Sequence, residues 1–195
     1  MERADGRRDG RTRDTRERVQ AVALELFVAH GFSQTTLQDI ADRLELTKAA
    51  LYYHFPTKTD LVRSVVQPAI DDVEALLTAA EHEAMPPREL LERFFDLHHR
   101  HRMVFLALVR DPTGLAGVDA ENWVPRLAQR FQELLAGPEA STEQRIRAVI
   151  AANGLSRCAT LLTDVPADEL RSTTVDVALQ TLGLPPAGAG RGART

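Results

Sequence analysis

The stretch TLQDIADRLELTKAALYYHFPTKTDL, residues 36–61, constrains the fold of this chain more than any other feature. Leu37, Ile40 and Leu44 recur at helical spacing, so the stretch opens with a short helix that has one apolar face. The tripeptide ELT over 45–47 predicts a tight turn, and the short helix after it ends in aromatic, imidazole and amine groups suited to phosphate. Two helices joined by such a turn are typical of the helix-turn-helix motif, whose second helix enters the major groove of DNA. The sequence therefore predicts DNA binding.

The composition of the 195-residue chain predicts an all-α fold. Hydrophobic residues make up 44% of it, which is enough for a core. Alanine, leucine, glutamate and arginine are abundant, and no run of alternating β-branched residues stands out. We expect about nine helices, three in an N-terminal head and six behind it. The expected organisation is a basic arm without fixed structure over 1–13, a helix-turn-helix DNA-binding domain over 14–61, a ligand-binding and dimerisation domain over 62–183, and a flexible tail over 184–195.

Cap and stop signals place the expected helices. The first should begin near Asp14 and end at Gly31, which accepts a left-handed conformation. Thr36 is the expected N-cap of the second helix. A long helix should run from Lys58 to about Glu83, preceded by a capping arrangement at Thr57 and Asp60.

Cysteine content and hydropathy indicate the compartment. The single cysteine, Cys158, excludes an intrachain disulfide framework and suits a reducing environment. No apolar stretch approaches the ~20 residues that span a bilayer. The N-terminal residues MERADGRRDGRTRD include no apolar segment of the kind found in a secretory signal. We therefore expect a cytoplasmic protein with no membrane contact and no cofactor.

Charge is distributed unevenly along the chain, whose net charge is −4. Residues 1–65 carry 11 Lys or Arg against 10 Asp or Glu, and residues 66–195 carry 13 against 18. The asymmetry has the sign expected for a DNA-binding front end, but it is mild. DNA binding would therefore depend on where the cations lie rather than on the total charge.

Three segments, TRERVQAVALELFVAHGF, TTLQDIADRL and TKAALYYHFPTKTDLV, together resemble the TetR family of bacterial transcriptional repressors. The resemblance covers residues 15–61, about a quarter of the chain. It implies a homodimer that binds a palindromic double-stranded DNA operator and represses transcription until a small-molecule effector enters the second domain. Two departures are that the family usually has glycine where this chain has Glu45 and Ala49.

Position by position, the resemblance implies DNA contacts at the start of the second helix, along the recognition helix and at the start of the long helix. The implied DNA-binding residues are Thr36, Thr47, Lys48, Ala49, Ala50, Tyr52, Tyr53, His54 and Lys58. Alternatives stay open at four of these positions. One of the adjacent residues Tyr52 and Tyr53 could pack inward, and His54 could instead cap the C-terminal end of its own helix. Lys58 could be a solvated surface lysine. Without glycine, the turn should be slightly strained, by roughly 1 kcal/mol.

A small-molecule site could form among the helices of the second domain. Apolar side chains at helical spacing accompanied by a few polar groups have the usual character of such a site. The candidate ligand-binding residues are Phe94, Leu97, His98, His101, Trp123, Leu127, Phe131, Asn153 and Arg157. Individually they could be ordinary core or surface. A metal at His98 and His101 is the weaker alternative, because a third and fourth ligand are not evident.

The last two long helices carry a stripe of small and aliphatic residues. Two such helices from each chain could form a four-helix dimer interface, although packing within one subunit is the alternative. The candidate interface residues are Ala148, Ala151, Ala152, Gly154, Ala159, Val175, Ala178, Leu179 and Leu182.

The sequence thus predicts a ligand-responsive repressor released by a small apolar effector. One rival is a DNA-binding regulator without a small-molecule effector, controlled by abundance or a protein partner. A second rival, an enzyme, is disfavoured because no Ser-His-Asp arrangement, Gly-rich phosphate loop or complete metal set can be placed.

Overall fold

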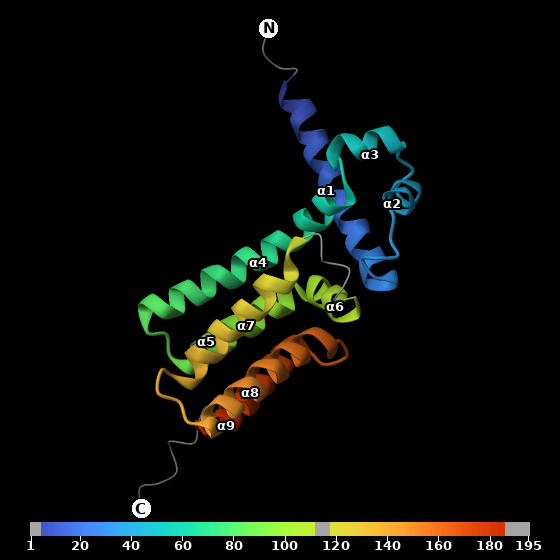
Figure 1. Ribbon diagram of the computed structural model, residues 1–195. Helices are drawn as coiled ribbons and strands as arrows, with labels where there is room; N and C mark the ends of the chain where they lie inside the picture. The colour runs from blue at the N-terminus through green and yellow to red at the C-terminus, as the bar shows by residue number, and fades with distance from the viewer. Residues whose placement is uncertain (1–4, 112–117, 186–195) are drawn as a thin grey trace, which may run out of the picture. The chain divides into compact units, whose positions relative to one another are not determined.

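The computed structural model of the protein describes residues 5–111 and 118–185. Within these ranges all regular elements are helices, nine in number, as predicted (Figure 1). They are α1 (Asp5–His30), α2 (Leu37–Arg43), α3 (Lys48–His54), α4 (Lys58–Glu83), α5 (Pro87–Arg100), α6 (Arg102–Arg110), α7 (Ala120–Ala136), α8 (Thr142–Leu161) and α9 (Ala167–Leu182). The ends of the expected arm and tail, residues 1–4 and 186–195, lie outside the described residues.

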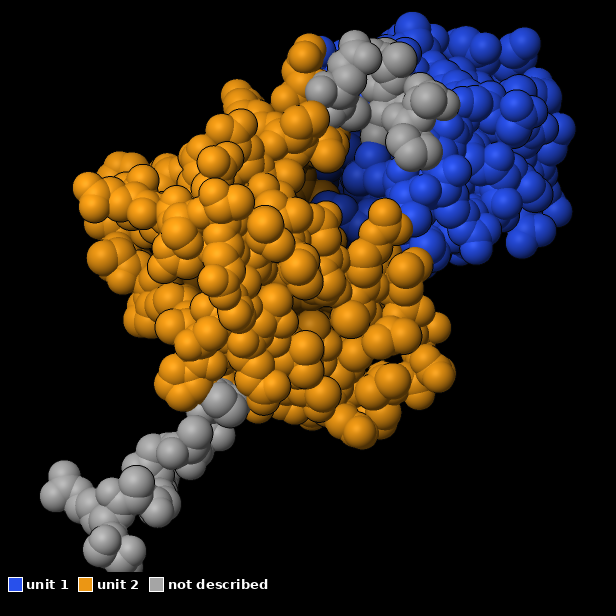
Figure 2. All heavy atoms as spheres, turned by 60° about the horizontal axis from the view of Figure 1, so that its bottom comes forward, with its two compact units in different colours: residues 1–68, 103–120 blue, residues 69–102, 121–195 orange. Residues whose placement is uncertain are grey.

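The chain divides into two compact units, coloured blue and orange in Figure 2. Unit 1 comprises residues 1–68 and 103–120, and unit 2 comprises residues 69–102 and 121–195. The boundary in α4 falls at Pro68, which lies inside the helix. Unit 1 therefore includes α6 in addition to the head that the sequence predicted.

The core of the head in unit 1 is formed by apolar side chains from α1 to α4 that are fully buried, among them Phe27, Phe32, Leu51 and Phe55. The rings of Phe27 and Phe32 pack with centroids 4.7 Å apart. Gly31 ends α1 with φ +85°, the left-handed conformation that its position predicted.

Local capping fixes where the helices of the head begin. Thr36 Oγ1 accepts the Asp39 N–H at 3.2 Å, and the Asp39 carboxylate accepts the Thr36 N–H at 2.8 Å. The same arrangement recurs at α4, where Thr57 Oγ1 accepts the Asp60 N–H at 3.0 Å. The predicted N-cap at Thr36 and the predicted capping pair before α4 are both confirmed.

The first helix begins at Asp5, well before the start that we expected near Asp14. Much of the segment expected to lack fixed structure is therefore helical. The segment contains no proline, and its arginines are good helix formers that offset the two glycines, Gly6 and Gly10. In addition, Arg13 pairs with Glu17 one turn later at 3.0 Å, so Asp14 lies in the helix interior rather than at its cap.

In unit 2, α5 packs against α8 and α9, which also pack against each other. The buried face of α8 is built mainly of alanine, which lets neighbouring helices approach closely. Ion pairs fix the register of α5 on α9: Arg171 holds both carboxylate oxygens of Asp96, at 2.6 and 3.0 Å, and Arg88 pairs with Asp176. None of the helices in the described ranges is long and apolar enough to cross a membrane.

Candidate nucleic-acid interface

The turn between α2 and α3 sets the direction of the second helix. Glu45 adopts φ +55° in this turn, so the left-handed conformation is held by a residue other than glycine at a cost of roughly 1 kcal/mol. The Leu46 N–H donates to the Ala41 carbonyl at 2.9 Å. Leu51, fully buried, anchors the inner face of α3 on the head. These contacts place α3 as the second helix of a helix-turn-helix.

The outer face of α3 presents the groups expected to contact DNA. Tyr53 is 78% exposed and Tyr52 is 40% exposed, so neither is a core aromatic. The Lys48 ammonium lies 5.6 Å from the centroid of the Tyr52 ring, and Ala49 is exposed. The half-buried residues on this helix are Ala50 and His54. The face therefore combines one cation, two phenols and a small apolar surface.

Thr47 lies at the start of this face and has a structural role. Its hydroxyl accepts the Ala50 N–H at 3.2 Å and so caps α3. The side chain is exposed, and its hydroxyl proton can still be donated to an acceptor outside the protein.

A notch of about 450 Å³ opens beside α3, lined in part by Thr36, Lys48, Tyr52, Thr57 and Lys58. The first turns of α2 and α4 meet there, and the N-terminal end of a helix carries unsatisfied N–H groups and a partial positive charge. Lysine, tyrosine and threonine side chains beside helix N-termini suit a phosphate of the DNA backbone.

Lys58 also contacts its own chain. Its ammonium donates to the Ser33 carbonyl at 3.2 Å, and partial burial lowers the pKa of Lys58 while the carboxylates of Asp111 and Asp39 oppose that effect. The Asp111 carboxylate accepts the Ser33 N–H at 2.7 Å. The loop between α1 and α2 is thus held by the start of α4 and by the residue that follows α6. A contact between Lys58 and DNA stays a prediction.

Arg16 is a contributor to this interface that the sequence did not reveal. Its Nη1 donates to the His54 carbonyl at 3.1 Å, and its guanidinium lies 4.4 Å from the centroid of the Phe55 ring. The last carbonyls of a helix have no partner within the helix, so this bond closes the C-terminal end of α3. No spacing signal marks a contact between residues this far apart in sequence.

We expect Arg16→Met to lower the free energy of unfolding by about 1 kcal/mol, the sum of an exposed hydrogen bond and a cation–π contact. Amide hydrogen exchange should accelerate in the last turn of α3. Arg13→Met is the matched control, because within the described residues Arg13 pairs with Glu17 alone, on the exposed face of the same helix. Equal exchange rates in the two variants would show that Arg16 does not support α3.

The expected small-molecule site is only partly assembled. Phe94 and Phe131 stack with ring centroids 3.7 Å apart, and the His98 ring lies 4.1 Å from Phe94. Leu97 and Leu127 are buried in unit 2 as well. These five side chains form part of a packed core.

The other four candidates lie apart from this core or at its edge. Trp123 and His101 are half-buried, whereas Asn153 and Arg157 are on the exposed face of α8. The Asn153 amide donates to a backbone carbonyl of its own helix at 2.9 Å. The structure therefore does not bring the polar candidates of α8 to the aromatic core.

The two histidines considered as metal ligands have protein partners. His98 contacts the Phe94 carbonyl at 3.0 Å, and burial lowers the pKa of its imidazole to about 4. His101 Nε2 lies 2.7 Å from Asp72 Oδ2, and this hydrogen bond holds the pKa of Asp72 below its usual range. In the part of the chain that the structure describes, no three His, Cys, Asp or Glu side chains are arranged to hold a metal ion.

Most residues expected at a dimer interface are buried within unit 2. The buried ones are Ala148, Ala151, Ala152, Ala159, Val175, Ala178 and Leu179. Leu182 is half-buried, and Gly154 is exposed. The alanine stripe thus packs inside the subunit, which is the alternative that the sequence left open.

A different set of apolar side chains faces outward from α8, α9 and the segment between them. Ile150, Leu162 and Val177 are 57%, 44% and 55% exposed. They line a groove of about 430 Å³ that runs between α8 and α9 and that we call the α8–α9 groove. Exposed apolar surface of this kind marks an interaction site in many proteins.

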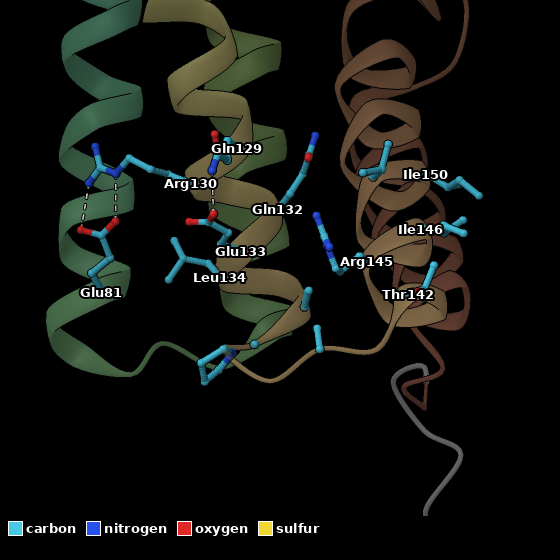
Figure 3. Close-up of a pocket in the computed structure, with 15 residues that line it drawn as sticks. Glu81, Gln129, Arg130, Gln132, Glu133, Leu134, Thr142, Arg145, Ile146 and Ile150 are labelled. Atoms are coloured by element: carbon cyan, nitrogen blue, oxygen red, sulfur yellow. Dashed lines mark hydrogen bonds and ion pairs between the residues drawn. The ribbon is translucent and has the colours of Figure 1, made fainter.

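A larger cleft, of about 1250 Å³, lies on the other side of α8. The end of α7, the turn over 137–140 and the first half of α8 line it, together with Glu81 of α4 (Figure 3). We call it the α7–α8 cleft. None of the nine residues expected to bind a small molecule lines this cleft.

Residues 20–65 match the profile of a family described as "Bacterial regulatory proteins, tetR family". This match covers the helix-turn-helix, the second half of α1 and the first turns of α4. The head of this chain is therefore similar to the N-terminal domain of TetR-family regulators. The family is described as one of regulatory proteins, and this favours a regulatory role over the enzyme alternative.

Two relatives align with part of this chain. It is 37% identical over 83 residues to a probable acrEF/envCD operon repressor of Escherichia coli (strain K12), covering 40% of this chain and 37% of that protein. It is 31% identical over 100 residues to the transcriptional repressor BepR of Brucella suis, covering 47% of this chain and 48% of that protein. The aligned part thus spans half or less of the length of either relative.

Solved structures of regulators share the fold over most of the chain. A TerR/AcrR-family transcriptional regulator from Aquifex aeolicus superposes with a TM-score of 0.65 and 21% identity, covering 84% of this chain and 96% of that one. AmtR of Mycobacterium smegmatis superposes with a TM-score of 0.65 and 22% identity, covering 87% and 86%. At these identities the likeness shows the fold alone.

Proposed function

We propose that the protein is a transcriptional repressor that binds a palindromic DNA operator as a homodimer and is released by a small, largely apolar effector. The proposal rests on the exposed face of α3. Lys48, Tyr52 and Tyr53 lie on this face, while the opposite face of the helix is anchored in the core of the head. The partial relatives named as repressors support the same role.

The composition of the α3 face suggests how DNA would be read. The methyl groups of Ala49 and Ala50 can pack on thymine methyls but donate no hydrogen bonds. Base-specific bonds would then come from Lys48 and Thr47, with DNA shape contributing at positions that the protein does not touch. Tyr52, with the notch beside it, would bind the phosphate backbone and fix the position of α3 in the groove.

The proposed response to an effector rests on the α7–α8 cleft, whose volume of about 1250 Å³ is sufficient for a small molecule. Movement in unit 2 would pass to the head through two connections. The helix α4 contributes to both units, and α6, which belongs to unit 1, is preceded and followed in sequence by segments of unit 2. The hydrogen bond between Asp111 and Ser33 would couple the end of α6 to the loop that precedes α2. A shift of either helix would then change the spacing of the two recognition helices of a dimer.

Selection of bound duplexes from a random DNA pool tests the DNA-binding proposal. We expect an inverted repeat whose half-sites lie one helical turn, ~34 Å, or a compatible distance apart. Recovery of sequences without symmetry would contradict the homodimeric arrangement, and recovery of no preferred sequence would contradict specific DNA binding.

Lys48→Ala and Tyr52→Ala should each weaken binding to the selected operator about tenfold, as expected for the loss of one charged or one hydrogen-bonded contact. Only the lysine variant should also reduce the slope of log affinity against log salt, by about one. Fluorescence anisotropy at several salt concentrations measures both effects. Arg126→Ala, which removes a positive charge from α7, should leave affinity and slope unchanged.

A further inference from the structure

The α7–α8 cleft is built from several packed elements rather than from a single loop. Figure 3 shows α7 on one side, α8 on the other and the turn over 137–140 closing the end between them. Gly137 makes that turn with φ +84°, and Ser141 caps α8 by accepting the Gln144 N–H at 3.3 Å. The turn at Gly137 and the N-cap at Ser141 therefore set where α7 ends and α8 begins at this end of the cleft.

Two polar side chains point into the cleft and have no partner there. Gln132 of α7 and Arg145 of α8 both project into the gap between the two helices (Figure 3). Within the described residues, neither the Gln132 amide nor the Arg145 guanidinium has a hydrogen-bond or ion-pair partner. The Gln132 amide and the Arg145 guanidinium are therefore both available to a ligand in the cleft.

The other charged groups at the cleft are already engaged. Arg130 makes two bonds of 2.9 Å to the carboxylate of Glu81, which satisfies both charges. The Glu133 carboxylate accepts the Gln129 amide at 2.8 Å on the same helix. Arg145 is thus the cation of the cleft that is still available to an anion.

The α8 wall of the cleft is apolar. Ile146, Val149 and Ile150 lie within the first three turns of α8, and Ile146 is 53% exposed. Exposed isoleucine side chains beside an unpaired guanidinium form a surface with one apolar part and one anion-binding part. The two parts match the two ends of an amphipathic anion.

We propose that the α7–α8 cleft binds an amphipathic organic monoanion. Arg145 and Gln132 hold its carboxylate, because a guanidinium binds a carboxylate through two parallel hydrogen bonds. The hydrocarbon part of the ligand lies along Ile146 and Val149. This site rests on the effector response proposed above and assigns a ligand class to it.

Decanoate is a suitable probe, titrated into the full-length protein by isothermal calorimetry below the concentration at which it forms micelles. We expect saturable binding that becomes at least about tenfold weaker in Arg145→Gln. Binding of 1-decanol, which has the same chain and no charge, should be weaker than that of decanoate and equal in the two proteins. Arg157→Gln is the matched control, since Arg157 is exposed on the same helix and does not line the cleft.

Three outcomes would overturn the site: no saturable heat with decanoate, equal affinity in wild type and Arg145→Gln, or an equal loss in Arg157→Gln. A separate measurement addresses the effector response. If decanoate binds as expected but leaves operator affinity unchanged, the cleft is a ligand site and the proposed release from DNA is wrong for this ligand class. Failure of the wild type to bind any operator would contradict the proposed function and leave the calorimetric result intact.

Discussion

A Val177→Glu variant should sediment as a monomer and bind the operator at least about a hundredfold more weakly than the wild type. Val177 is 55% exposed at the α8–α9 groove, which is lined mainly by apolar side chains. If a second copy of the chain covers this groove, the variant must bury a carboxylate without a partner, which costs several kcal/mol. Each recognition helix would then bind its half-site alone and lose the effective concentration that the dimer supplies.

Val124→Glu provides the matched control for this prediction. Val124 is 41% exposed on α7 and does not line the α8–α9 groove. The Val124→Glu variant should stay dimeric and keep its operator affinity. Comparison of the two variants therefore distinguishes loss of the interface from a general effect of added surface charge. Analytical ultracentrifugation gives the oligomeric state and fluorescence anisotropy gives the affinity. A Val177→Glu protein that is still a dimer would place the interface elsewhere.

The features of the head that the sequence predicted are those encoded locally. Thr36 and Thr57 each lie three residues before an aspartate, and the capping bonds are made within that interval. Gly31 and Glu45 adopt the left-handed conformations that their places in the turns required. Such signals depend on neighbouring residues alone, and this is why the first residues of α2 and α4 could be predicted without a structure.

Features that depend on distant contacts could not be predicted. The Asp111 carboxylate reaches Ser33 across 78 positions, and the Arg16 guanidinium reaches the His54 carbonyl across 38. Neither contact leaves a periodic pattern in the sequence. For the same reason α6 was expected to belong with the second domain, although it groups with the head in unit 1.

Apolar patterns in the second domain showed which faces would be buried but not what would cover them. Ala148 and Ala151 are buried because α8 packs on α5 and α9 of the same chain. Close packing of α8 against a second subunit would also have required small residues, so the sequence pattern could not distinguish the two cases. The aromatic residues expected to surround a ligand instead pack on one another, as Phe94 and Phe131 do. The α7–α8 cleft depends on the spacing between two helices, and that spacing is set by a turn rather than by a residue pattern.

Acidification should destabilise the protein through His98 in a defined pH window. The side chain is 4% exposed, and burial, followed by a smaller effect of His101, lowers the pKa of His98 to about 4, against the opposing effect of its bond to the Phe94 carbonyl. In the unfolded chain the imidazole should titrate near its ordinary pKa, about 6.5. Between these values the unfolded chain binds a proton that the folded chain excludes. Stability should therefore be constant above pH 6.5, fall by about 1.4 kcal/mol per pH unit below it, and lose about 3 kcal/mol by pH 4.

Urea denaturation at pH 7 and at pH 4.5 measures this loss. A His98→Leu variant should lack most of the pH dependence between these values, because it removes the buried imidazole while keeping an apolar side chain of similar size. His82→Leu is the control, since His82 is exposed on α4. The low pKa of Asp72 acts in a lower window, because a carboxylate whose folded pKa is depressed loses its contribution only as pH falls below its ordinary value of about 4. If His98→Leu keeps the same slope as the wild type, other groups cause the acid sensitivity and His98 does not limit stability.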